Sequence, residues 1–109
     1  MKVYLGRNER TARGGFVVTV VDPKRGPRPL APRNDLINHS PNGFAWGYGG
    51  SGPAQLALAL AADVLGDDKA ALRVYQDLKW DLIAKLPAEW ELTTHEITEA
   101  LRAIIRGKP

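Results

Sequence analysis

The sequence contains no cysteine and only two histidines among its 109 residues. The lack of cysteine excludes disulfide bonds, thiol nucleophiles and the common cysteine-based zinc sites. His39 and His95 lie in unlike contexts and indicate neither a metal site nor another cofactor. No apolar run approaches the roughly 20 residues of a membrane span, and the first residues lack the apolar core of a signal peptide. We therefore expect a soluble cytoplasmic protein without membrane contact.

Length and composition are typical of one ordinary globular domain. Single domains usually hold about 100–150 residues, so we expect one domain over residues 1–109. Hydrophobic residues make up 44% of the chain and charged residues 25%, which argues against a disordered or membrane class. Strand and turn patterns occupy residues 1–50, whereas residues 53–106 carry helical patterns. The prediction is an α+β fold.

The strand patterns lie in the first half of the chain. Residues 3–5 and 16–21 read as strands, joined by a polar hairpin connection over residues 7–15 that ends in two glycines. Because residues 16–21 are apolar with little alternation, we expect a strand that is covered on both faces or central in its sheet. Four prolines in residues 22–32 predict an extended, exposed loop outside the ladder. Residues 44–48 are either a further short strand or an ordered aromatic loop.

The second half predicts three helices. Residues 53–65 are apolar on nearly every side, which is typical of a helix buried in the middle of a domain, and Gly66 ends it. Asp67 or Asp68 caps the second helix, and Thr93 with Glu96 forms a capping box before the last one. The expected inward stripes are Leu72, Tyr75, Leu78, Leu82 and Leu86, then Ile97, Leu101, Ile104 and Ile105. A small antiparallel sheet should pack on these helices, with the first helix central.

A glycine-rich turn over residues 47–52 precedes the buried helix. Converging N–H groups and the helix dipole make an anion or nucleotide site physically reasonable there. The alternative is a purely structural turn, and we expect positive φ in at least one of Gly49, Gly50 and Gly52. The spacing fits no dinucleotide-binding, Walker or nucleophile-elbow motif in its required context. The candidate ligand-binding residues are Trp46, Tyr48, Gly49, Gly50, Ser51 and Gly52.

The charges divide unevenly along the chain. Residues 1–33 hold eight basic and two acidic residues, whereas residues 63–100 hold nine acidic and four basic ones. A basic end of this kind can contact phosphates or an acidic protein surface, but no nucleic-acid-binding module accompanies it. We expect nucleic-acid binding to be weak. The candidate basic patch consists of Arg7, Arg10, Arg13, Lys24, Arg25 and Arg28.

No catalytic residues are predicted. Asp35, His39 and Ser40 resemble a hydrolase triad by composition, but nothing in their spacing fixes a nucleophile–base contact.

The sequence as a whole has a familiar pattern. The residues that carry it are 38–41, 43–44 and 46–59, together with Tyr4, Gly6, Arg7, Tyr75, Gln76, Asp77, Lys79, Leu86, Pro87, Trp90 and Leu92. The chain resembles a family of small bacterial and phage-borne proteins known only as a domain of unknown function. The resemblance implies a phage or mobile-element context and supplies no activity.

These observations favour a non-enzymatic binding or inhibitory module that acts through contacts with a protein partner. A small-ligand binder that captures an anion or nucleotide at the glycine-rich turn is the second hypothesis, and a weak nucleic-acid binder is the third. An open, concave turn favours the ligand hypothesis, and a buried turn favours a structural role. The sequence does not predict an oligomeric state.

Overall fold

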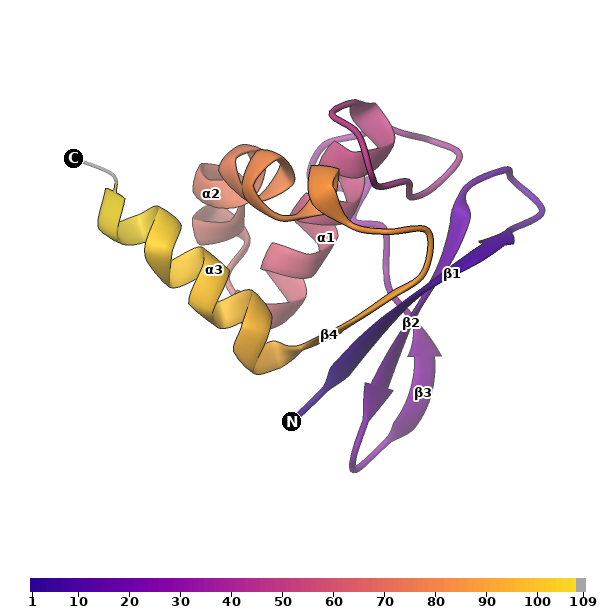
Figure 1. The fold of residues 1–109 in the computed structure, drawn as a ribbon, viewed down its shortest axis with the longest axis horizontal. Coiled ribbons are helices and arrows are strands. Elements are labelled where there is room, and N and C mark those ends of the chain that lie inside the picture. The colour runs from indigo at the N-terminus through magenta and orange to yellow at the C-terminus, as the bar shows by residue number, and fades with distance from the viewer. Residues whose placement is uncertain (108–109) are drawn as a thin grey trace.

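A computed structural model of the protein describes residues 1–107. Its elements are β1 (Val3–Arg10), β2 (Phe16–Asp22), β3 (Gly26–Pro29), α1 (Ser51–Leu65), α2 (Asp68–Asp81), the short 3-10 helix η1 (Ile83–Lys85), β4 (Trp90–Thr93) and α3 (Thr94–Gly107). The strands form one antiparallel sheet in the order β3-β2-β1-β4. The three α-helices lie on one side of this sheet, with α1 in the middle of the molecule (Figure 1). The expected α+β class is confirmed.

The β1–β2 hairpin is longer than predicted. Residues 7–15 were expected to be a connection, but β1 continues to Arg10, which pairs with Phe16 beyond an irregularity in the register. The remaining turn is closed by a hydrogen bond from the Thr11 N–H to the Gly15 carbonyl. The last four residues of β1 are exposed, and the tip extends beyond the rest of the sheet (Figure 1). A strand end that buries neither face has no apolar alternation, so periodicity underestimates its length.

Residues 26–29 form β3, where the sequence predicted a loop outside the sheet. Pro27 and Pro29 stand opposite Val21 and Thr19 of β2. An edge strand tolerates proline, because a residue whose nitrogen faces away from the neighbouring strand donates no ladder hydrogen bond. The prediction was therefore wrong over this stretch, and the edge position of β3 is the physical reason.

Helix α1 is the centre of the core, as its apolar sequence predicted. Leu56, Leu58 and Leu60 are fully buried, although Leu58 points to the opposite side of the helix from Leu56 and Leu60. The helix begins at Ser51, two residues before the predicted start. It ends at Gly66, whose φ of 65° is left-handed and whose N–H donates to the Ala62 carbonyl.

The caps of the later helices are confirmed. The Asp67 side chain accepts a hydrogen bond from the first turn of α2. Thr93 and Glu96 exchange side chain–backbone hydrogen bonds of 3.1 and 3.0 Å before α3. No helix within residues 1–107 is long and apolar enough to cross a membrane.

The apolar stripes of these two helices are partly wrong. Leu72 and Ile105 are exposed, by 37% and 52%. Helix α2 ends at Asp81, so Leu82 and Leu86 lie beyond it. Small and β-branched residues complete the inward face of α2, whose buried members are Ala71, Val74, Tyr75 and Leu78.

Candidate functional site

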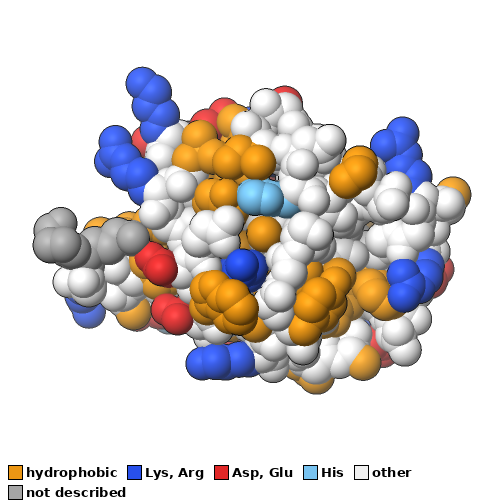
Figure 2. All heavy atoms as spheres, turned by 90° about the horizontal axis from the view of Figure 1, so that it is seen from above, with side chains coloured by type: hydrophobic (Ala, Val, Ile, Leu, Met, Phe, Trp, Pro, Cys, Tyr) orange, Lys and Arg blue, Asp and Glu red, His pale blue; other side chains and the backbone are white. Residues whose placement is uncertain are grey.

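The glycine-rich turn leads into the start of α1 on the face of the molecule shown in Figure 2. Hydrophobic side chains gather in the middle of this face, with basic side chains among and around them (Figure 2). Positive φ occurs at Gly47, at 84°, and at none of Gly49, Gly50 and Gly52. Our expectation for these three glycines was wrong.

Close contacts explain the three glycines instead. A Cβ atom on Gly49 would overlap the ring of Trp80, and one on Gly50 would lie 2.7 Å from the ring of Tyr48. A Cβ atom on Gly52 would lie 2.7 Å from that of Ala45. The turn therefore needs residues without a side chain because aromatic rings and a neighbouring segment lie directly on its backbone.

Two exposed aromatic side chains lie at this turn. Tyr48 is 55% exposed and Trp80, from the end of α2, is 57% exposed. The Lys79 ammonium lies 4.5 Å from the centre of the Trp80 ring. Trp80 was not among the residues predicted from sequence, although a tryptophan on the polar side of an amphipathic helix is a signal that could have identified it.

Trp46 occupies a different place from the other candidate ligand residues. It is only 9% exposed, and its ring lies 5.2 Å from that of Phe16 and 5.4 Å from that of Trp90, measured between centroids. Its indole N–H donates to the Ala88 carbonyl. The structure thus places Trp46 in the core.

The candidate basic patch is divided over four places. Arg10 and Arg13 lie at the tip of the β1–β2 hairpin, and Lys24 and Arg25 at the turn between β2 and β3. Arg7 lies on β1. Arg28 belongs to an ion-paired cluster around Asp63 at the end of α1, described below.

The hairpin tip and the glycine-rich turn meet at one hollow. Arg10 and Arg13 line it together with Tyr48, Ser51 and Gly52, and its volume is about 470 Å³. Members of both candidate sets, far apart in the chain, are therefore brought together by the fold.

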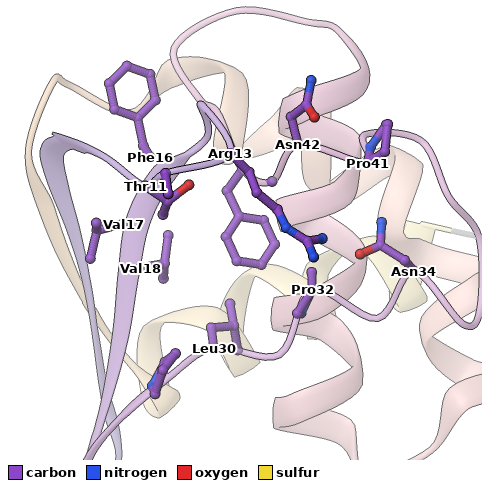
Figure 3. A pocket seen from close by; sticks show the side chains of 14 residues that line it. Thr11, Arg13, Phe16, Val17, Val18, Leu30, Pro32, Asn34, Pro41 and Asn42 are labelled. Atoms are coloured by element: carbon purple, nitrogen blue, oxygen red, sulfur yellow. The ribbon is translucent and has the colours of Figure 1, made fainter.

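A second hollow of about 390 Å³ adjoins the first and is mostly apolar. It lies between β2 and the segment 29–44. Both hollows are lined by Arg13, Phe16, Asn42, Gly43 and Phe44. We call the two together the hairpin groove, with a polar half and an apolar half. In Figure 3 the Arg13 side chain reaches across the apolar half toward Pro32 and Asn34.

The polar half is electropositive. Arg10 and Arg13 are exposed, and no Asp or Glu is among the residues that line it. Ser51 and Gly52 are the first residues of α1, whose initial N–H groups have no acceptor within the helix. Gly50, the N-cap, provides no side-chain cap, and the first turn contains no acid. The half is therefore suited to a carboxylate or phosphate.

The outer wall of the groove was not recognised from sequence. Gln55 of α1 is fully buried and accepts hydrogen bonds from the N–H groups of His39 (2.9 Å) and Ser40 (3.1 Å). Its amide nitrogen donates to the Pro32 carbonyl at 2.6 Å. One side chain thus fixes both ends of the wall segment 32–40. The available signal was a lone amide in an apolar helix, because a buried amide requires partners.

Asp63 anchors the sheet to the end of α1. Lys2 and Arg28 approach its carboxylate at 2.9 and 3.0 Å, and the Tyr4 hydroxyl donates to it at 2.6 Å. Burial alone would raise the pKa of Asp63, but these three hydrogen bonds outweigh it and leave the pKa below its usual range. Burial, followed by the Asp63 hydrogen bond and charge, raises the pKa of Tyr4. The cluster joins the sheet to α1, and because Arg28 is paired with Asp63 it does not belong to a basic patch.

The considered triad does not assemble. Asp35 pairs with Arg33 at 3.1 Å, while His39 Nε2 lies 2.8 Å from the Tyr75 hydroxyl. Among residues 1–107, no three metal-ligating side chains gather into a site. The side chains that line the hairpin groove include two arginines, hydroxyl and amide groups, and apolar surfaces.

Comparison with known proteins identifies a family. A family model described as a family of unknown function, DUF6166, matches residues 4–103, and the chain belongs to this family. No curated protein and no solved structure is significantly similar to the chain. The expected membership of an uncharacterised domain family is confirmed, whereas the phage origin stays a prediction.

Proposed function

We propose that this domain is a non-enzymatic binding module that holds a segment of a protein partner in the hairpin groove. The observation that carries the proposal is that an apolar hollow and an electropositive hollow share one wall. A segment with an apolar side chain next to an Asp or Glu matches both halves at once.

The chemistry of each half supports such a segment. In the apolar half, Val18, Leu30 and Phe44 can cover an aliphatic or aromatic side chain. In the polar half, Arg10 and Arg13 can form charge-assisted hydrogen bonds with a carboxylate. The electropositive lining also disfavours basic segments, which gives the groove selectivity.

The exposed aromatic pair extends the proposed contact surface. Tyr48 lines the polar half, and Trp80 covers Gly49, the residue after Tyr48. Tyrosine and tryptophan are enriched among the residues that contribute most to protein–protein binding. We propose that the partner continues from the groove over this pair.

The wider context is part of the same proposal. The resemblance stated above supports a phage or mobile-element context, and in that context we propose that the small domain inhibits a host or phage component in the cytoplasm. A weak nucleic-acid contact through Lys24 and Arg25 would use a separate part of the surface.

A small anionic ligand is the second candidate. The observation that favours it is the pair of helix N-terminal residues Ser51 and Gly52 in the lining of the polar half. A nucleotide could place its phosphates there and its base in the apolar half.

Selection from a displayed peptide library tests the proposal. The wild-type protein should enrich peptides that carry Asp or Glu next to a large apolar residue, and Arg10→Glu/Arg13→Glu should lose them. The matched control, Lys24→Glu/Arg25→Glu, makes the same change in charge at another turn and should keep them. Enrichment of peptides without acidic residues would contradict the proposal.

Thermal melts with inorganic phosphate and a nucleotide panel test the second candidate. A rise in Tm at millimolar ligand that Arg13→Glu abolishes, together with no peptide enrichment, would favour a small ligand over a protein partner.

A further inference from the structure

One face of the sheet has no cover within residues 1–107. Successive strand residues point to opposite faces, and Tyr4, Val18 and Val20 point toward the helices and are buried. The alternate side chains of β1 and β2 make up what we call the outer sheet face: Val3, Leu5, Val17, Thr19 and Val21. These residues are only partly buried, and the helices all lie on the other side (Figure 1).

This face is unusually apolar for a surface in contact with water. Antiparallel sheets with one solvated face normally alternate apolar and polar residues. Here four of the five outward side chains are aliphatic, and none of them belongs to the hydrophobic core or packs against it. Pro27 and Pro29 of β3 stand beside them, opposite Val21 and Thr19. A contiguous patch of this kind marks an interaction surface.

The β3 edge of the sheet is unsuited to pairing with a further strand, which favours contact through the sheet face. Pro27 and Pro29 have no N–H to donate, so β3 is a poor template for a further strand. A partner that covers the aliphatic side chains must therefore lie on top of the sheet.

The charges on this face point to the identity of the partner. Arg7 follows Leu5 on the same side of β1, and Glu91 of β4 stands opposite Leu5. Both are exposed. A surface that carries one charge of each sign beside an apolar patch is complementary to itself, as the contact in a two-fold dimer requires. We propose that a second copy of this chain covers the outer sheet face.

The strand register defines the arrangement. A two-fold axis in the plane of the contact, running obliquely to the strands and passing between Leu5 and Thr19, brings Arg7 of each copy opposite Glu91 of the other. The same axis brings Val21 opposite Pro29 of the second copy. Four strands about 4.8 Å apart and about five residues long cover on the order of 300 Å², less than the roughly 800 Å² per partner of a stable complex. The dimer is therefore weak and forms only at high protein concentration.

Sedimentation velocity between about 5 and 500 µM protein tests the proposal. The wild type should shift from monomer to dimer over this range. Arg7→Glu and Glu91→Arg should each stay monomeric, because each places like charges across the contact. An equimolar mixture of the two variants should form heterodimers, since opposite charges then face each other in both contacts between the copies. Arg106→Glu, the same charge change on α3, should dimerise like the wild type.

A crosslinking experiment tests the position of the axis. The chain has no cysteine, so Thr19→Cys introduces a unique thiol near the axis, and Leu72→Cys provides an exposed control on α2. Mild oxidation should give a covalent dimer with Thr19→Cys about ten-fold faster than with Leu72→Cys. A monomer at 500 µM, a mixture that does not restore the dimer, or equal crosslinking at both positions would overturn the proposal. The hairpin groove does not depend on this result.

Discussion

The wall of the hairpin groove should depend on a single buried amide. Gln55→Met replaces the amide by an apolar side chain of similar length and removes all three hydrogen bonds to the segment 32–40. The N–H groups of His39 and Ser40 and the carbonyl of Pro32 then lose their partners. A buried polar group left unsatisfied costs about 1–3 kcal/mol.

The expected loss is smaller than the sum of three such penalties. The wall segment can open toward solvent and let water replace part of the contacts, so we expect a fall of about 3 kcal/mol in the free energy of unfolding. In a domain of this size this corresponds to a fall of roughly 10–20 °C in Tm. Denaturant titrations followed by tryptophan fluorescence measure it.

A matched control distinguishes the loss of a buried amide from the replacement of an exposed glutamine by methionine. Gln76 also donates a side-chain hydrogen bond, to the Tyr75 hydroxyl, but it is exposed. Gln76→Met should change the free energy of unfolding by less than about 0.5 kcal/mol. A Gln55→Met loss below about 1 kcal/mol would refute the reasoning, because the wall would then be held by other contacts. The variant should also weaken binding of any peptide selected on the wild type.

Three further predictions concern the core, the turn and the ionic cluster. Leu58→Ala should lower the free energy of unfolding by about 2–5 kcal/mol in denaturant titrations, whereas exposed Leu72→Ala should change it by under about 0.5 kcal/mol; equal effects would contradict the placement of α1. Gly47→Ala should cost about 1–2 kcal/mol because of its positive φ, and Gly107→Ala, at an open helical position, should cost nothing. Because the folded pKa of Asp63 is lowered, the stability it adds is present above about pH 4 and is lost as pH falls through the folded value. Asp63→Asn should therefore reduce the acid dependence of Tm, and an unchanged pH profile would rule out this role.

The parts of the fold that were predicted correctly depend on short-range signals. The capping box of Thr93 and Glu96 and the left-handed stop at Gly66 involve residues a few positions apart, so sequence alone contains the whole interaction. The burial of α1 followed from a composition with no polar side.

The parts that were predicted wrongly depend on position within the sheet. Proline argues against a central strand, but β3 is an edge, and nothing in residues 26–29 distinguishes the two cases. The end of β1 buries neither face, so it lacks the alternation by which strands are recognised. The apolar run of β2 predicted a strand that is either covered on both faces or central in its sheet. It is central, and its uncovered outer face leads to the dimer proposed above.

The candidate groove illustrates why a site is harder to predict than an element. Arg10 and Ser51 were each selected from sequence, for different reasons, but only the fold places them in one hollow. The reason for each glycine is likewise not predictable from the local sequence alone. A glycine can be required for its backbone freedom, as at Gly47, or for its missing side chain, as at Gly49 beneath Trp80. The first requirement is local, whereas the second depends on a ring contributed by another helix. A double-mutant experiment can distinguish these two requirements. Trp80→Ala should remove the close contact that excludes alanine at Gly49, so Gly49→Ala should lower the free energy of unfolding less in the Trp80→Ala background than in the wild type. Gly47→Ala should lower it equally in both backgrounds.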